Sequence, residues 1–272
     1  MEDFRVTILG CGGAGGVPSI SAGWGACDPT NPLNRRRRAS ILLQWRGAGQ
    51  VDRYLLVDAS PDFREQILSV GIRRLDALVV THAHADHVHG LDDLREINRS
   101  MGGPLDLWAR EEDLDVLEQK FGYCFTPLAP GATTVYKPIL NKRILNPGEM
   151  VRPIEGDDLE LLPFTQDHGW ATTIGLRFGP FAYSTDVVGL DNAAFEALKG
   201  VDTWVVDCFG PDKHPTHAHV ELVLEWLERV KPRQAILTHM GPGLDYRELS
   251  ARLPCHVRPA FDGMVILPNA GD

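Results

Sequence analysis

One short stretch, residues 81–87, constrains this chain more than any other part of its sequence. It places three histidines and one aspartate in the pattern H-x-H-x-D-H. The apolar residues 75–80 before it predict a buried strand, and residues 89–94 after it predict the start of a helix. The stretch thus lies on a turn between a strand and a helix, where α/β proteins place their chemistry.

The side chains of this turn are suited to bind metal ions. On an extended segment His82 and His84 point to the same side, and the turn brings Asp86 and His87 round to the same space. Imidazole nitrogens and carboxylate oxygens are ligands for zinc and manganese. Four such ligands this close together predict two neighbouring metal ions rather than one.

Length and composition are typical of a soluble cytoplasmic protein. The chain has 272 residues, 43% of them hydrophobic, and no linker or tandem repeat divides it, so we expect one domain over residues 1–272. The net charge of −10 argues against a broad nucleic-acid-binding surface. We expect no signal peptide and no membrane span, because the sequence lacks the apolar runs that these require. The five cysteines are dispersed, which fits reduced thiols.

Two further features leave alternatives open. Residues 10–16 contain G-x-G-x-x-G, but no helix follows, which excludes a dinucleotide site. Their glycines either let the backbone pass close to the metal centre or to a phosphate, or simply form a flexible loop. The four arginines at positions 35–38 form either a solvated face or a guanidinium site for a phosphate oxygen.

The hydrophobic pattern predicts strands followed by alternating strands and helices in each half of the chain. This order suits two sheets packed face to face with helices outside. We expect Ser60 to cap a helix over residues 60–68, and residues 124–153 to form a loop and hairpin near the pocket. The expected strands are residues 4–9, 39–45, 53–58, 75–80, 105–109, 158–164, 173–178, 181–184, 201–208, 233–238 and 264–267. The other expected helices are residues 90–100, 111–121, 192–199, 219–230 and 246–252.

The histidine motif resembles the signature of the metallo-β-lactamase superfamily of binuclear metallohydrolases. The resemblance implies an α/β fold, a four-layer αββα sandwich of two mixed β-sheets. It also implies three further ligands at strand ends, which His168, Asp186 and His239 match in order. The implied ligands of the first metal are His82, His84 and His168, those of the second are Asp86, His87 and His239, and Asp186 bridges the two.

The resemblance further implies the chemistry of this centre. Its cofactors are two divalent metal ions, Mn²⁺ or Zn²⁺, and a hydroxide held between them is the nucleophile. Asp86 could also take up a proton from the water that gives this hydroxide.

Residues 207–219 resemble two branches of the superfamily, the phosphoribosyl cyclic phosphodiesterases and the tRNA 3′-processing endonucleases. In both branches a histidine ahead of the last helix donates a proton to the leaving alkoxide. His217 matches this position best, and His219 is second. The resemblance also implies substrate binding by Arg35, Arg36 and His219. No separate basic insertion corresponds to the tRNA-binding arm, so we expect a small substrate rather than tRNA.

Three functions compete at this point. The first is a phosphodiesterase that acts on a nucleotide-like or ribose cyclic phosphate, with His217 as the general acid. The second is a hydrolase of a lactone, thioester or lactam, which would need neither His217 nor the arginines. The third is a metal-dependent binding protein, which the full ligand set disfavours. We expect no membrane partner, and a homodimer stays open because the superfamily often forms dimers.

Overall fold

The computed structural model describes residues 2–268, and its first sheet has seven strands. Their spatial order is β13-β1-β2-β3-β4-β5-β6. The pairs from β13 to β3 are antiparallel, and those from β3 to β6 are parallel. The strands are β1 (Glu2–Gly10), β2 (Ser40–Arg46), β3 (Asp52–Val57), β4 (Ala77–Val79), β5 (Leu105–Ala109), β6 (Leu140–Ile144) and β13 (Val265–Ile266).

The second sheet has six strands in the order β12-β11-β10-β9-β8-β7. The pairs from β7 to β9 are antiparallel, and those from β9 to β12 are parallel. Both sheets are therefore mixed. The strands are β7 (Leu162–Asp167), β8 (Thr172–Phe178), β9 (Phe181–Ser184), β10 (Thr203–Asp207), β11 (Gln234–Thr238) and β12 (Val257–Pro259).

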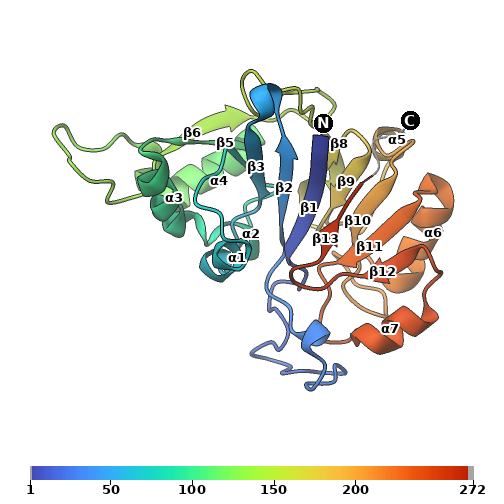
Figure 1. The fold of residues 1–272 in the computed structure, drawn as a ribbon. Coiled ribbons are helices and arrows are strands. Elements are labelled where there is room, and N and C mark those ends of the chain that lie inside the picture. The colour runs from blue at the N-terminus through green and yellow to red at the C-terminus, as the bar shows by residue number, and fades with distance from the viewer. Residues whose placement is uncertain (1, 269–272) are drawn as a thin grey trace.

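The two sheets pack face to face, and helices cover their outer faces (Figure 1). The first sheet carries α1 (Phe63–Val70), α2 (Ala85–Val88), α3 (Leu94–Met101) and α4 (Glu111–Phe121). The second carries α5 (Asn192–Ala197), α6 (Val220–Val230) and α7 (Tyr246–Arg252). Short 3₁₀ turns lie at Pro32–Asn34, Ala48–Gln50, Leu91–Asp93 and Gly122–Phe125. Among residues 2–268 no helix has the length and apolar character needed to cross a bilayer.

Strand β2 shows why the central strands are apolar throughout. Ile41 and Leu43 pack into the core between the sheets, while Leu42 packs into the cluster under α1, α3 and α4. Successive side chains of a strand point to opposite faces. A strand that is covered on both faces therefore needs apolar residues at every position.

The αββα architecture expected from the sequence is confirmed, but some elements differ. Helix α1 begins at Phe63 rather than at residue 60, because the Ser60 hydroxyl accepts a hydrogen bond from the Asp62 amide at 3.1 Å. This contact holds a turn ahead of the helix. Strand β7 begins at Leu162 rather than at residue 158, and β12 was not expected.

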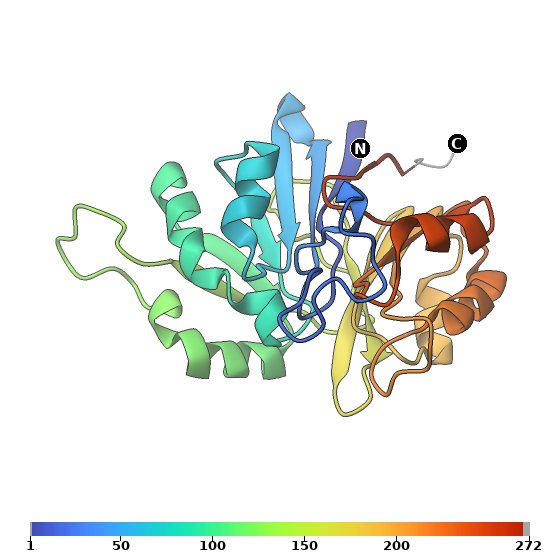
Figure 2. The same ribbon diagram turned by 90° about the horizontal axis from the view of Figure 1, so that it is seen from below.

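Residues 124–153 do not form the expected hairpin. They run out as a protruding loop and return as β6, which pairs in parallel with β5 at the edge of the first sheet (Figures 1 and 2). A parallel partner cannot be recognised from the local pattern, because its register is set by a strand more than 30 residues earlier.

Candidate metal centre

The candidate ligands come from loops that follow strands of both sheets. The motif of residues 81–87 follows β4, His168 follows β7, Asp186 follows β9 and His239 follows β11. In parallel sheets the carboxyl ends of neighbouring strands lie at one edge, where binding sites form. The face-to-face packing of the sheets brings these two edges together.

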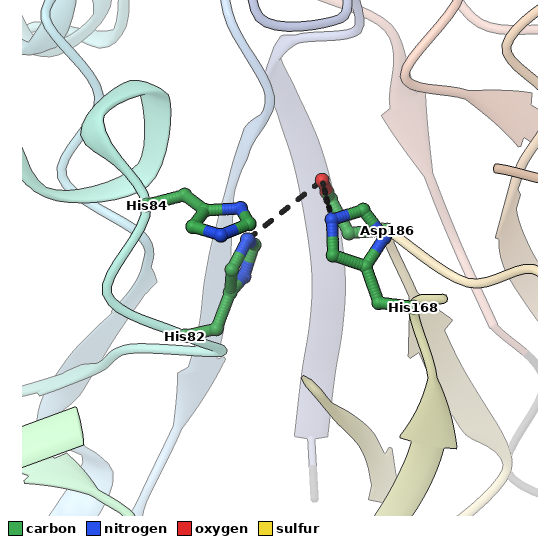
Figure 3. A group of neighbouring side chains, drawn as sticks. All are labelled: His82, His84, His168 and Asp186. Carbon is green, nitrogen blue, oxygen red and sulfur yellow. Dashed lines mark ion pairs between the residues drawn. The ribbon is translucent and has the colours of Figure 1, made fainter. Parts of the chain in front are cut away.

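Three histidines and one carboxylate form the first cluster, with His82 and His84 on one side and His168 and Asp186 on the other (Figure 3). The Nε2 atoms of His82 and His168 each lie 3.7 Å from Asp186 Oδ1. The ligand atoms of all four residues lie within 4.8 Å of one another.

The second cluster shares Asp186 with the first. His87 Nε2 lies 3.1 Å and His239 Nε2 lies 3.3 Å from Asp186 Oδ2. The same two nitrogens lie 3.2 and 3.5 Å from Asp86 Oδ2. Asp186 therefore directs one oxygen to each cluster, which is compatible with the bridging position that the family resemblance implies.

The donor atoms of the two clusters fit divalent metal ions. Four of them are buried and have no hydrogen-bond partner among the described residues, namely His82 Nε2, His87 Nε2, His239 Nε2 and Asp86 Oδ2. A buried polar atom without a partner costs free energy. Imidazole nitrogens and carboxylate oxygens that converge in this way could regain that energy by binding zinc or manganese.

A carboxylate that the sequence analysis missed, Asp58, orients two of the histidines. Its Oδ2 lies 2.7 Å from His87 Nδ1 and accepts a hydrogen bond from the Thr81 hydroxyl at 2.9 Å. The Thr81 hydroxyl lies in turn 3.1 Å from His82 Nδ1. With Nδ1 protonated in both rings, each presents Nε2 to the centre. The sequence feature that could have pointed to Asp58 is its position at the end of β3, the strand that pairs with β4 ahead of the motif.

Three residues of this region have left-handed backbone conformations that non-glycine residues rarely adopt. The φ angles are 62° at Asp58, 53° at Asp186 and 54° at His239. Each of these residues turns the chain sharply just after β3, β9 or β11. Strained backbone of this kind concentrates at functional sites, where the surrounding structure holds it in place.

The imidazoles of the two clusters differ in their pKa. Burial lowers the pKa of His82, His84 and His168. Burial also opposes a charge on His87 and His239, but there Asp186 and Asp86 outweigh it and raise both pKa values, that of His239 to about 9. Without a metal ion, the surroundings of the first cluster therefore favour neutral imidazoles, and those of the second favour protonated ones.

His217 lies against both clusters. Its ring is 4.8 Å from His239 and 4.9 Å from His168, centroid to centroid. Its Nδ1 lies 2.9 Å from Oδ2 of Asp207, which is fully buried and ends β10. Asp207 was not assigned a role from the sequence, although its place at a strand end gave the same signal as Asp58.

His219 does not share this environment. It is the residue before α6, and within residues 2–268 no ring contact or hydrogen bond joins its side chain to the clusters. Of the two histidines weighed from the sequence, only His217 has a ring contact with candidate ligands among residues 2–268.

The expectation that Arg36 binds substrate is contradicted by its surroundings. Its guanidinium is buried and donates to the carbonyl oxygens of Gly241 at 3.1 Å and Leu244 at 2.7 Å. Arg36 thus fastens the loop of residues 11–38 to the segment after β11. Arg35 is exposed, and no contact in the described part of the chain links it to the clusters.

The other two arginines of the run pair with carboxylates. Arg37 pairs with Asp262 at 3.1 Å, and Arg38 pairs with Asp62 at 2.8 Å. Both pairs connect the loop to neighbouring segments, so the structure gives neither arginine the solvated or the phosphate-binding surroundings that the sequence suggested.

Comparison with known proteins agrees with this geometry. The family model described as "Beta-lactamase superfamily domain" matches residues 53–240. A crystal structure of a diphosphatase from the PhnP family is 32% identical, covers 97% of each chain and has a TM-score of 0.85. The human short-form tRNase Z covers 97% of this chain and 99% of its own at 16% identity and a TM-score of 0.65, which shows the fold alone.

One curated relative is much longer than this chain. The octanoyltransferase of Porphyromonas gingivalis is 29% identical over 263 residues, and the match covers 96% of this chain but 51% of that protein. Its name therefore describes a protein of which this chain spans about half. With the family model, the PhnP-family structure and the αββα fold in agreement, the chain belongs to the metallo-β-lactamase superfamily, in the branch that contains the PhnP family.

Proposed function

We propose that this chain is a binuclear metal-dependent phosphodiesterase that acts on a nucleotide-like or ribose phosphate, including cyclic ones. The observation that carries the proposal is His217, which is held by Asp207 at 2.9 Å beside His168 and His239. An alkoxide is a poor leaving group and needs a proton in the transition state. A relative with 32% identity is named a diphosphatase, which supports phosphorus as the reacting centre.

The residues of the centre have separate tasks in this proposal. His82, His84 and His168 would hold one divalent ion, Asp86, His87 and His239 the other, and Asp186 both. Such ions, when bound, lower the pKa of water and offset charge that develops on phosphate oxygens.

Proton transfer falls to two side chains. Asp86 extends its Oδ2 toward the shared space and would accept a proton there. Asp207 keeps Nε2 of His217 directed away from itself, so that this nitrogen would donate to the leaving oxygen.

Replacement of His217 by alanine tests the proposal. On an unactivated ribose phosphodiester we expect turnover to fall about 10²–10⁴-fold, the usual contribution of a general acid. On bis-p-nitrophenyl phosphate the loss should be smaller, because nitrophenolate leaves without a proton. Metal content measured by elemental analysis should stay unchanged, since His217 is outside the proposed ligand set.

His219→Ala is the matched control, because His219 is two residues away in the chain and, among residues 2–268, no hydrogen bond or ring contact joins its side chain to the clusters. It should retain activity on both substrates. Equal turnover of wild type and His217→Ala on the unactivated substrate would show that His217 is not the general acid. No turnover of either phosphodiester by the metal-loaded wild type would favour a carbonyl hydrolase, which does not need this histidine.

A further inference from the structure

A pocket of about 370 Å³ lies beside the metal centre and has no part in the function proposed above. This volume is within the range of small-molecule sites. Three loops form it, those that follow β1, β10 and β11. Six of its twelve lining residues are glycines, and none carries a charge.

The ring of Phe209 joins this pocket to the centre. It lines the pocket and stacks on the ring of His217 at 5.0 Å with an interplanar angle of 25°. It also lies 6.3 Å from the ring of His239. A group bound in the pocket would therefore contact the same Phe209 side chain that stacks on the proposed proton donor.

Two glycines let the backbone approach this ring closely. A Cβ atom on Gly13 would lie 2.8 Å from Phe209 Cε2, and one on Gly241 would lie 3.2 Å from the same atom. The backbones of two loops therefore close directly onto the ring edge. This explains part of the glycine-rich stretch of residues 10–16, whose backbone passes close to an aromatic ring of the site.

We propose that this pocket, which we call the glycine pocket, receives the leaving alcohol of the substrate, and that this alcohol carries a flat, uncharged ring system such as a nucleoside. The inference rests on the proposed function, because His217 marks the leaving side of the phosphodiester. A second phosphate on that side would meet no cationic side chain in the lining. A flat ring suits walls of bare backbone beside Phe209, and the hydroxyls of Ser19 and Ser21 offer it polar contacts.

The variant Gly210→Leu adds a large side chain to the lining of the glycine pocket without backbone strain. Gly210 lines the pocket, an added Cβ meets no atom within 4 Å, and its φ is not in the left-handed region. Gly103→Leu is the matched control, because Gly103 has equally free space and lies far along the chain, after α3. Ser21→Leu, from another part of the lining, replaces Gly210→Leu if that variant fails to fold.

The test compares two unactivated cyclic phosphates that share the reacting ring, adenosine 2′,3′-cyclic phosphate and propane-1,2-diol cyclic phosphate. We expect wild type and Gly103→Leu to prefer the adenosine compound in kcat/KM by about 10- to 100-fold, as stacking of one base implies. In Gly210→Leu this ratio should fall toward one. Calorimetric titration of the manganese-loaded protein with adenosine should show binding to wild type and its loss in Gly210→Leu.

The outcomes separate the two proposals. If both compounds are hydrolysed and Gly210→Leu keeps the wild-type ratio, the glycine pocket is not the leaving-group site, while the phosphodiesterase stands. If wild type hydrolyses neither compound, the proposed function fails. The calorimetric titration with adenosine then tests by itself whether the glycine pocket binds a flat uncharged ring. Adenosine binding that Gly210→Leu abolishes then supports the pocket as a site for flat uncharged rings, and no binding to wild type overturns it.

Discussion

His82 and His239 show how neighbouring ligands of one centre reach different charges. Burial and the nearby charge of His87 lower the pKa of His82. Burial acts in the same direction on His239, but the carboxylates of Asp186, Asp207 and Asp86 prevail. A metal ion binds the neutral imidazole, so it must displace a proton wherever the metal-free pKa is raised.

This difference predicts that the two metal ions bind with different proton release. At pH 7.5 an ion at His82, His84 and His168 should release almost none, because these pKa values are lowered. An ion at His87 and His239 should release protons from both rings, and its affinity should rise as the pH approaches about 9, the pKa of His239. Calorimetric titration with manganese in buffers of different ionisation enthalpy measures the protons released at each step.

The control for this experiment is Asp186→Ala. Loss of the shared carboxylate removes a main cause of the raised pKa values, so proton release should shrink together with the amount of bound metal. Equal proton release in both binding steps of the wild type would show that the two clusters do not differ in charge.

The loop of residues 11–38, drawn in blue in Figure 2, is anchored to distant parts of the chain by side-chain hydrogen bonds. Arg36 holds it to Gly241 and Leu244, and Asn34 donates to Asp245 at 2.6 Å. These contacts position the segment that follows His239 and one wall of the glycine pocket. The arginine run thus contributes to the site by fastening an element.

Substitution of Arg36 should therefore weaken the fold. Arg36→Met removes the charged donor from two buried carbonyl oxygens, and we expect the free energy of unfolding to fall by about 2–4 kcal/mol. Urea denaturation followed by circular dichroism measures this loss. Arg35→Met is the matched control, since its exposed side chain should change stability by no more than about 0.5 kcal/mol. A similar loss in both variants would contradict the anchoring role.

The candidate metal centre spans the interface between the two sheets. The motif of residues 81–87 belongs to the first sheet, while His168, Asp186 and His239 follow strands of the second. Metal ions at these clusters would connect the two halves of the sandwich directly. Binding to the folded state alone stabilises the whole molecule by mass action.

Chelation should consequently lower the melting temperature of the entire domain. At a free concentration 100 times the Kd, one ion adds about 2.7 kcal/mol. For a chain of this size this corresponds to a Tm increase of about 5–10 °C for each ion. Calorimetric scans with excess EDTA, and again after addition of manganese or zinc, measure the difference.

His217→Ala should keep this metal-dependent increase in Tm, and Asp186→Ala should lose most of it. A melting temperature that does not respond to EDTA or to added metal would exclude a metal centre that links the sheets.

Local patterns in the sequence were sufficient to predict four candidate ligands and the layers of strands and helices around them. Four candidate ligands lie within residues 81–87, and spacing along an extended segment and a turn suffices to bring them together. The apolar strands were equally readable, because burial on both faces leaves a continuous local pattern. Edge strand β6 and the start of α1 were harder to predict. The position of β6 depends on its pairing with β5, and the start of α1 depends on the turn that Ser60 holds.

Contacts between distant segments determine which of two nearby histidines touches the candidate ligands and what the arginines bind. His217 is selected by Asp207, Phe209 and His239, which come from the ends of β10 and β11. The Arg36 side chain is buried because it donates hydrogen bonds to the carbonyl oxygens of Gly241 and Leu244, which lie more than 200 residues later in the chain. Asp58 can orient His87 because β3 pairs with β4, which brings the end of β3 next to the motif. Contacts between distant segments depend on how strands pair and how sheets pack. Strand pairing and sheet packing cannot be inferred from the spacing of residues in a single sequence.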